Sequence, residues 1–306
     1  MKIVFFGTSN VALPVLETLY RHHDVAAVIT SPDAASGRKQ TLVESPVSVL
    51  AKEMDIELLK PEKVKGNADF LAQLQRLRAD IFVVVSYGKI LPLEVINLPP
   101  HKTLNVHFSL LPKYRGASPI QYALLNGESQ TGTSIFVLDE KMDTGPIVAQ
   151  KAVAVEADDN FVTLSQRLAY LSAQLLLDIL PKYVSGEAVP VPQDEALSSY
   201  TKIINKADGQ VDWQKSAFEI YNQFRAFYPW PGVWTLWNGK KMKILDCEAK
   251  KAEPGLPLGV AGTDGWVGCG GNSVLRLKLV QLEGKSQVGM AAFLNGYPKF
   301  IGSTLG

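Results

Sequence analysis

Hydrophobic residues are spaced in two alternating ways along the first part of the chain. Short apolar, β-branched runs are typical of strands covered on both faces, and apolar residues three or four positions apart are typical of amphipathic helices. The expected strands are Lys2–Phe6, Val25–Thr30, Ile81–Ser86, Thr103–Phe108, Thr133–Leu138 and Ile147–Val155, and the expected helices are Val11–Tyr20, Pro46–Met54, Asn67–Arg78 and Asn160–Tyr183. This alternation predicts an α/β fold, a Rossmann-like and mostly parallel sheet with helices on both faces.

The pattern changes near residue 189. Residues 189–206 place two prolines among polar side chains, which indicates an extended linker. A helix over Asp212–Tyr228 and glycine-separated short strands are expected beyond it; the strands are Val233–Trp237, Met242–Ala249, Gly265–Cys269 and Val274–Leu282. We therefore predict an α/β domain over residues 1–188 and a small antiparallel, OB-like β-barrel over residues 207–306.

Composition and charge limit the classes of partner. The chain has 306 residues, 46% hydrophobic and 20% charged, which is typical of a globular protein. A formal net charge of +1 excludes a global field that draws the whole molecule to a polyanion. Residues 207–306 hold 11 Lys and Arg against 8 Asp and Glu, so the second domain is better suited to contact a polyanion.

Cysteine, histidine and hydropathy patterns bear on metals and membranes. Cys247 and Cys269 form no CxxC arrangement, and no two histidines have HExxH spacing, so we expect no metal. No apolar stretch approaches the ~20 residues of a membrane span, and the first residues lack a signal-peptide layout. The expectation is a cytoplasmic protein that does not associate with membranes.

The first strand ends at a single glycine, Gly7, in the segment FFGTSNVALP. A dinucleotide-binding fingerprint needs further glycines for the pyrophosphate approach and for helix packing, and no GxxxxGK[ST] phosphate loop occurs elsewhere. We therefore expect no bound dinucleotide, and we interpret Gly7 as a tight strand-to-helix turn.

Asn105 and His107 are the first candidates for chemistry. The period of two in a strand puts both side chains on one face, close to the strand's end, where ligands bind in open α/β sheets. An amide and an imidazole on an otherwise apolar strand are poorly explained as core residues, because each needs polar partners when buried. Asp143 is the third candidate, because Thr144 and Gly145 allow a tight turn that directs its carboxylate inward. The neighbouring Asp139 and Glu140 are interpreted as a solvated turn.

The residues N-V-H-x-S-L-L-P-x-x-R-G, followed about thirty positions later by D-x-G-P, resemble the folate-dependent formyltransferases. The segments FFGTSNVALPVLE, VVVSYGKILP, SLLPKYRGASPIQYALLNGE, TGTSIFVLDEKMDTGP and RAFYPWPG are similar to segments of the family's tRNA-acting members. The resemblance covers both predicted domains and nearly the whole chain. It implies a monomer that uses 10-formyltetrahydrofolate as formyl donor and initiator methionyl-tRNA as acceptor.

The same resemblance implies that Asn105, His107 and Asp143 are the catalytic residues. An amine that attacks a formyl carbon gives a tetrahedral intermediate with a negative oxygen, which the Asn105 NH2 and a His107 N–H are able to stabilise by donating hydrogen bonds. Asp143 is expected to hold His107 in a donating state and to help move the amine proton to the leaving nitrogen.

Family analogy also implies a folate pocket and an RNA surface. The expected tetrahydrofolate contacts are Ser109, Leu110, Leu111 and Pro112, with the backbone of Lys89, Ile90 and Leu91 lining the pterin pocket. Core filling is the alternative for Leu110 and Leu111, and turn formation is the alternative for Pro112. The expected tRNA contacts are Arg38 and Lys39, in a long connection over residues 31–45, and Lys240, Lys241 and Lys243. Each of these cations is equally explained as a solubilising side chain, and the Arg38 segment lacks one arginine of the family pattern.

Two other functions remain open at this stage. The same chemistry on an amino sugar or a purine-pathway amine is the first, although the region beyond residue 206 argues against the compact purine-pathway members. A catalytically silent RNA-binding protein on the same scaffold is the second, and the presence of all three candidate catalytic residues argues against it.

Overall fold

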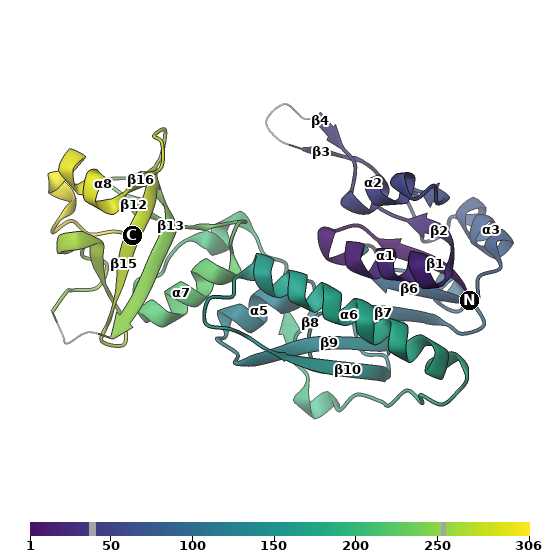
Figure 1. Cartoon of the computed structure of the whole chain (residues 1–306). Coiled ribbons are helices and arrows are strands. Elements are labelled where there is room, and N and C mark those ends of the chain that lie inside the picture. The colour runs from purple at the N-terminus through teal and green to yellow at the C-terminus, as the bar shows by residue number, and fades with distance from the viewer. Residues whose placement is uncertain (37–40, 252–254) are drawn as a thin grey trace. The chain divides into compact units, whose positions relative to one another are not determined.

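The computed structural model describes residues 1–36, 41–251 and 255–306. The chain forms two compact units (Figure 1). Unit 1 contains Met1–Pro119, Gln130–Ala154 and Ser165–Thr201, and unit 2 contains Ile120–Ser129, Val155–Leu164 and Lys202–Gly306.

A seven-stranded sheet forms the centre of unit 1, in the order β10-β9-β7-β6-β1-β2-β5. Its strands are β1 (Lys2–Gly7), β2 (Asp24–Ile29), β5 (Leu58–Leu59), β6 (Ile81–Val85), β7 (Thr103–His107), β9 (Gln130–Val137) and β10 (Ile147–Ala154). The pairs from β5 to β7 are all parallel, and β9 and β10 extend the sheet as an antiparallel hairpin beside β7. The expected Rossmann-like, mostly parallel sheet is confirmed.

The order of the parallel strands reverses at β1, which pairs with β2 on one side and β6 on the other. Ligands of open α/β sheets bind beyond the carboxyl ends of the strands, near such a reversal. Gly7 ends β1 there, and a Cβ on it would lie 2.6 Å from the Phe5 ring and 3.1 Å from the Val85 carbonyl oxygen. Gly7 is itself a strand residue without a left-handed φ, so close packing, rather than the expected tight turn, is what requires a glycine there.

Helices cover both faces of this sheet. They are α1 (Leu13–His22), α2 (Pro46–Glu53), α3 (Ala68–Leu77), α4 (Leu93–Ile96) and the part of α6 (Phe161–Val184) that belongs to unit 1. Helix α5 (Pro119–Leu125) belongs to unit 2 from Ile120 onward. On one face of the sheet, Phe70 and Leu74 of α3 pack against Val4 and Phe6 of β1 in a continuous buried core. Figure 1 shows α1 and α6 crossing in front of the strands.

Local sequence sets two of the helix starts. Asn67 accepts a hydrogen bond from the backbone nitrogen of Phe70 at 3.0 Å and so caps α3. Ser45 accepts one from Ser48 at 3.0 Å, and Pro46 occupies the first turn of α2, where its missing N–H has no cost.

Residues 189–201 belong to unit 1, although the sequence predicts an extended linker over 189–206. Val191 and Ile147 exchange backbone hydrogen bonds at 2.8 Å. Further along, β11 (Tyr200–Thr201) pairs in parallel with β8 (Arg115–Gly116). Proline and polar residues favour an extended chain in either case, and here that chain is attached to unit 1 by hydrogen bonds although many of its side chains are exposed. The long connection after β2 also differs from a simple loop, since β3 (Ala34–Ser36) and β4 (Thr41–Val43) pair within it.

Unit 2 is built on a five-stranded antiparallel sheet in the order β12-β13-β15-β14, with β16 beside β15. Its elements are β12 (Val233–Trp237), β13 (Lys240–Lys251), β14 (Trp266–Cys269), β15 (Ser273–Leu282), β16 (Val288–Gly289), α7 (Ala217–Ala226) and α8 (Met290–Gly296). Helix α7 begins at Ala217, later than the expected Asp212, because Ser216 and Glu219 form a capping box that fixes the start.

The named strands of unit 2 form an open sheet, so the expected OB-like barrel is not confirmed. Short backbone contacts nevertheless connect its two edges. Ala261 bridges Val267 of β14, its neighbour Val260 bridges Thr304, and Gly306 exchanges hydrogen bonds of 3.1 Å with Leu236 of β12. Within the described residues, no helix is long and apolar enough to span a membrane.

Candidate functional site

Strand β7 positions Asn105 and His107 two residues apart at the carboxyl end of the parallel strands. Asn105 is half-buried and lies opposite Phe136 of β9, whereas His107, at the last position of β7, is buried. In the part of the chain that the structure describes, the Asn105 side chain has no hydrogen-bond partner. Its NH2 group is therefore available to donate to a ligand.

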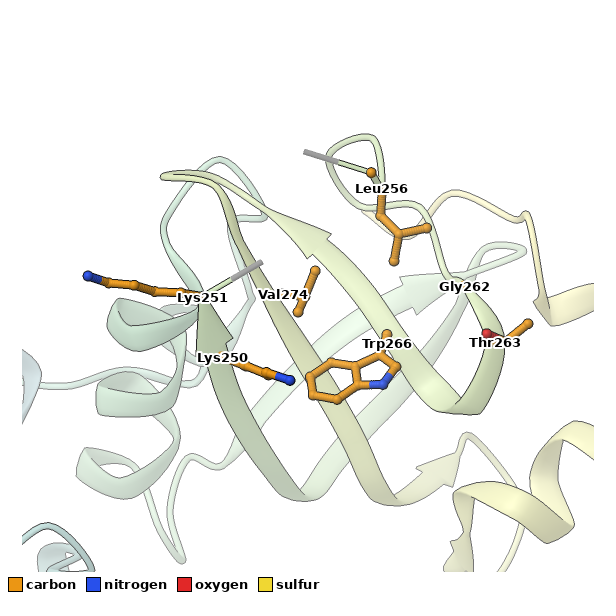
Figure 2. Close-up of a pocket in the computed structure, with 8 residues that line it drawn as sticks. Lys250, Lys251, Leu256, Gly262, Thr263, Trp266 and Val274 are labelled. Carbon is orange, nitrogen blue, oxygen red and sulfur yellow. The ribbon is translucent and has the colours of Figure 1, made fainter. Parts of the chain in front are cut away.

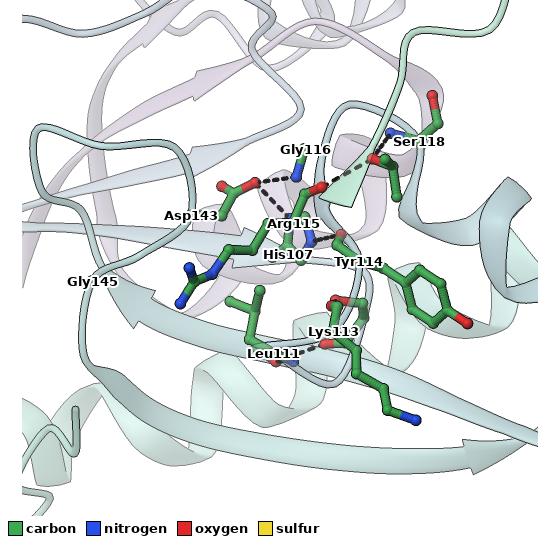
Figure 3. Close-up of polar contacts among 12 residues, drawn as sticks. His107, Leu111, Lys113, Tyr114, Arg115, Gly116, Ser118, Asp143 and Gly145 are labelled. Carbon is green, nitrogen blue, oxygen red and sulfur yellow. Dashed lines mark hydrogen bonds and ion pairs between the residues drawn. The ribbon is translucent and has the colours of Figure 1, made fainter. Parts of the chain in front are cut away.

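His107 faces a hydrogen-bond acceptor at each ring nitrogen (Figure 3). Its Nε2 lies 2.9 Å from the carbonyl oxygen of Tyr114, and because a carbonyl only accepts, Nε2 carries a proton. Its Nδ1 lies 3.7 Å from Oδ2 of Asp143. That separation is longer than a direct hydrogen bond, and catalytic contacts in unliganded enzymes are often long in this way.

Asp143 occupies a left-handed turn after β9. Its φ of 55° is unusual for a residue with a side chain and is better tolerated by Asp than by most residues. The turn directs the carboxylate inward, where Oδ2 accepts a hydrogen bond of 2.7 Å from the backbone nitrogen of Gly116. Asp139 at the start of this loop is not simply solvated, because it accepts hydrogen bonds from the Thr144 hydroxyl at 2.8 and 2.9 Å. The structure thus brings His107 and Asp143 together.

The loop between β7 and α5 is tied to residues 193–201 over its whole length. Tyr114, at φ 62°, donates its backbone N–H to Ser199 Oγ at 2.9 Å, and Arg115 donates its own to the Ser199 carbonyl at 2.8 Å. Thr201 Oγ1 accepts from the backbone of Ser118 at 3.1 Å and donates to the Arg115 carbonyl at 3.1 Å. These bonds fix the Tyr114 carbonyl and the Gly116 nitrogen, which contact His107 and Asp143.

Arg115 is a site residue that the sequence reasoning missed. Its side chain is fully buried and forks onto both carboxylate oxygens of Glu195, at 2.7 and 2.9 Å. It also donates to Gln193 Oε1 at 2.8 and 3.1 Å and to the Tyr200 hydroxyl at 3.1 Å. The hydrogen bond from Arg115 lowers the pKa of Glu195, and the same bond raises the pKa of Arg115. The acidic and amide side chains of Glu195 and Gln193, in the segment predicted to be a linker, were the sequence feature that could have indicated partners for this arginine.

The expected folate residues after β7 form a hydrogen-bonded loop. Ser109 is buried, its hydroxyl donates to the Lys113 carbonyl at 2.6 Å, and its carbonyl accepts from Ser134 Oγ at 2.6 Å. Leu111 is buried as well, and its backbone nitrogen donates to Ser134 Oγ at 3.0 Å. Leu110 packs against Gly132 of β9, where an added Cβ would lie 2.5 Å from it. The side chains of Leu110 and Leu111 thus pack against the protein, and Pro112 follows Leu111 in the turn.

The segment after β6 contains the other expected folate residues. Lys89 donates from Nζ to the carbonyls of Pro61 and Glu62 at 2.7 and 2.9 Å. Ile90 is 82% exposed, and Leu91 is buried in the core beside α3 and α4. The Lys89 anchor holds this segment at the same edge of the sheet as the end of β7, with the exposed Ile90 side chain available to an apolar ring.

The expected tRNA-contacting cations fall into two groups. Arg38 and Lys39 lie outside the described residues. Lys240, Lys241 and Lys243 lie on β13 of unit 2, where Lys240 and Lys243 are exposed and Lys241 Nζ stands 3.8 Å above the Trp234 ring. Burial, with a smaller effect of Lys243, lowers the pKa of Lys241.

Unit 2 also contains a cavity of about 600 Å3 beside the end of β13 (Figure 2). Its lining residues are Lys250, Lys251, Gly255, Leu256, Gly262, Thr263, Trp266 and Val274. Figure 2 shows the Lys250 amine directed toward the Trp266 ring and Lys251 pointing away from it. The described lining residues combine an aromatic face with cations, and none of them carries a carboxylate.

A grouping of three or more His, Cys, Asp or Glu side chains suited to a metal ion does not occur in the described ranges. An amide, an imidazole and a carboxylate around one end of a parallel strand are typical of enzymes that act on a carbonyl carbon. The family model "Formyl transferase" matches residues 1–180, and the model "Formyl transferase, C-terminal domain" matches residues 203–298. The chain therefore belongs to the formyl transferase family.

Curated relatives match at nearly full length. The methionyl-tRNA formyltransferase of Koribacter versatilis is 42% identical over 300 residues, covering 97% of this chain and 96% of the relative. That of Caldanaerobacter subterraneus subsp. tengcongensis is 39% identical over 300 residues, with 97% of each chain covered.

Solved structures share the fold at lower identity. WlaRD, a sugar 3N-formyl transferase solved with dTDP and 5-N-formyl-THF, has a TM-score of 0.67 at 21% identity and covers 94% of this chain and 99% of its own. HypX from Aquifex aeolicus, solved with tetrahydrofolic acid, has a TM-score of 0.61 at 16% identity, over 98% of this chain and 48% of HypX.

Proposed function

We propose that the chain transfers the formyl group of 10-formyltetrahydrofolate to the free amino group of initiator methionyl-tRNA. Full-length relatives of this name at 39 and 42% identity support the acceptor. The observation that carries the chemistry is the placement of Asp143 Oδ2 at 3.7 Å from His107 Nδ1, at the end of the strand that also holds Asn105. The Asn105 amide has no hydrogen-bond partner among the described residues.

The oxyanion is stabilised in this proposal from the β7 side. Attack by the amino nitrogen forms the new C–N bond and moves the carbonyl electron pair onto oxygen. The Asn105 NH2 donates to that oxygen, and a single such donor contributes about 2.7–4 kcal/mol in other enzymes. His107 has committed its Nε2 proton to the Tyr114 carbonyl, so it donates to the substrate from Nδ1, on the side of Asp143, only when the ring carries a second proton.

Asp143 is the proposed group for proton transfer. The attacking amine becomes positively charged and loses a proton to the carboxylate, directly or through one water. The leaving N10 of folate gains a proton as its bond to the formyl carbon breaks, which gives formyl-methionyl-tRNA and tetrahydrofolate. The Gly116 N–H donates to the Asp143 carboxylate at 2.7 Å, which positions the carboxylate before a substrate binds.

The folate is proposed to lie between the loop after β7 and the segment after β6. Ser109–Pro112 and the backbone of Lys89–Leu91 are its proposed walls. The hydrogen bonds of Ser109 and Lys89 support this assignment, because they keep both segments in place before the substrate binds.

The tRNA is proposed to contact the exposed face of β13 and the connection that includes Arg38 and Lys39. Lys240, Lys241 and Lys243 supply phosphate contacts, which give affinity without reading sequence. The cavity beside Trp266 and Lys250 offers an aromatic face and a cation to an unpaired nucleotide of the same RNA. The protein is proposed to act in the cytoplasm as a monomer. Size-exclusion chromatography tests the oligomeric state.

Incubation of the protein with 10-formyltetrahydrofolate and one of two acceptors tests the function. Charged initiator methionyl-tRNA is expected to yield formyl-methionyl-tRNA and tetrahydrofolate, and a dTDP-linked amino sugar is expected to remain unmodified. Formylation of the sugar without formylation of the tRNA would instead assign the chain to the amino-sugar formyltransferases.

A further inference from the structure

The side chain of Gln193 connects the Asp143 turn to the buried Arg115. Its Nε2 donates to the carbonyl of Asp143 and to the carbonyl of Gly145, both at 2.8 Å. Its Oε1 accepts from Nη2 and Nε of Arg115 at 2.8 and 3.1 Å. All four contacts lie within unit 1.

The chemistry of these partners fixes the orientation of the amide. Two guanidinium N–H groups require the oxygen on one side, and two carbonyls require the NH2 on the other. Gln is therefore suited to this position in a way that Glu and Leu are not, since Glu offers no donor and Leu neither donor nor acceptor.

The two carbonyls held by Gln193 flank Thr144, so the amide bridges the turn that directs the Asp143 carboxylate inward. That turn contains the left-handed residue Asp143, at φ 55°, whose conformation requires support from its surroundings. The Gly116 N–H holds the carboxylate, and Gln193 holds the backbone behind it. Loss of either anchor allows the carboxylate to move away from His107.

We infer that Gln193 is a positioning residue for the reaction: it keeps the Asp143 carboxylate in place beside His107 by clamping the backbone on both sides of Thr144. This inference rests on the proposed catalytic role of Asp143. The predicted linker segment, which contains Gln193 and Glu195, would thus contribute to catalysis. Arg115 contacts both residues and so orients Gln193.

Gln193→Glu is the test variant. A carboxylate still accepts the Arg115 hydrogen bonds, so the fold is retained, whereas its oxygens repel the carbonyls of Asp143 and Gly145. We expect kcat to fall roughly tenfold to a hundredfold, the cost of a misplaced catalytic group, with little change in KM for folate or tRNA. Leu197→Ala is the matched control, since Leu197 lies in the same segment and is 61% exposed.

A double-variant cycle separates positioning from general stabilisation. If Gln193 acts through Asp143, then Asp143→Asn with Gln193→Glu is no slower than Asp143→Asn alone. A further fall in the double variant, a normal kcat for Gln193→Glu, or an equal loss in Leu197→Ala would overturn the inference. If Asp143→Asn alone keeps full activity, the proposed catalytic role of Asp143 fails; if only Gln193→Glu keeps it, the positioning role fails alone.

Discussion

The carbonyl oxygen of Val137 lies where a side chain on Gly145 would begin, since an added Cβ would be 1.8 Å from that oxygen. Gly145 closes the turn that starts at Asp143, and its own carbonyl accepts the Gln193 hydrogen bond at 2.8 Å. The close approach of two backbone segments thus sets the direction of the Asp143 carboxylate.

Gly145→Ala is therefore expected to displace the turn and to lower kcat strongly, together with a lower free energy of unfolding. Contact with a backbone atom cannot be relieved by rotating a side chain. Steady-state kinetics and urea unfolding measure the two effects. Gly296→Ala, in α8 and with no atom near the added Cβ, is expected to keep both values. Unchanged activity in Gly145→Ala would show that the turn is not needed.

Arg115→Lys should destabilise unit 1 although it conserves the charge. Lysine does not reproduce the planar fork that contacts Glu195, Gln193 and Tyr200 at once. We expect a loss of about 1.5–3 kcal/mol in the free energy of unfolding, the range for hydrogen bonds to charged groups. Arg276→Lys is the control, because its ion pair with Glu248 is exposed on both sides. Equal stability of the two variants would contradict the assigned role of Arg115.

The Arg115–Glu195 pair predicts a pH dependence of stability. Arg115 lowers the pKa of Glu195 below its ordinary value, so the stabilisation is fully present above that ordinary value, about 4.3, and is lost as the pH falls through the lowered pKa. Thermal unfolding between neutral pH and about pH 3 should show a smaller acid-dependent loss in Glu195→Gln than in the unchanged protein. Identical losses would rule out this contribution of the pair.

Lys243→Glu should weaken tRNA binding while leaving folate binding unchanged. Lys243 is exposed on β13, beside Trp234 in register, and a phosphate contact there releases counterions. The expected result is a higher KM for tRNA and a salt-dependence slope of log K reduced by about 1. Lys299→Glu, an exposed charge of the same unit outside β13, serves as the control. Equal effects of the two variants would remove β13 from the RNA surface.

Most of the α/β fold could be predicted from the sequence because hydrophobic spacing records which faces are buried. The runs at Lys2–Gly7 and Ile81–Val85 are continuous, as both faces of β1 and β6 are covered. The starts of α2 and α3 were predictable from Ser45, Pro46 and Asn67, whose capping chemistry is local. The pairing of β3 with β4 was not predicted, because these short segments have no hydrophobic alternation.

The candidate site was predicted only in part. The two-residue period of a strand predicted that Asn105 and His107 lie on the same face of one strand. The small residues after Asp143 indicated the turn that it occupies. The contacts made by Gln193, Glu195 and Ser199 are about eighty residues away from Arg115 in sequence, and no local pattern records such a separation. The hydrogen bond from His107 Nε2 to the Tyr114 carbonyl also depends on the folded loop, and it leaves only Nδ1 to face a substrate.

The single-turnover rate of formyl transfer from 10-formyltetrahydrofolate to methionyl-tRNA by Asp143→Asn shows whether the Asp143 carboxylate takes part in the reaction. The substitution keeps the size of the side chain and removes its negative charge beside His107. We expect a rate lower by about 10²–10⁴, with tRNA affinity and unfolding midpoint unchanged. A rate equal to that of the unchanged protein would contradict this expectation.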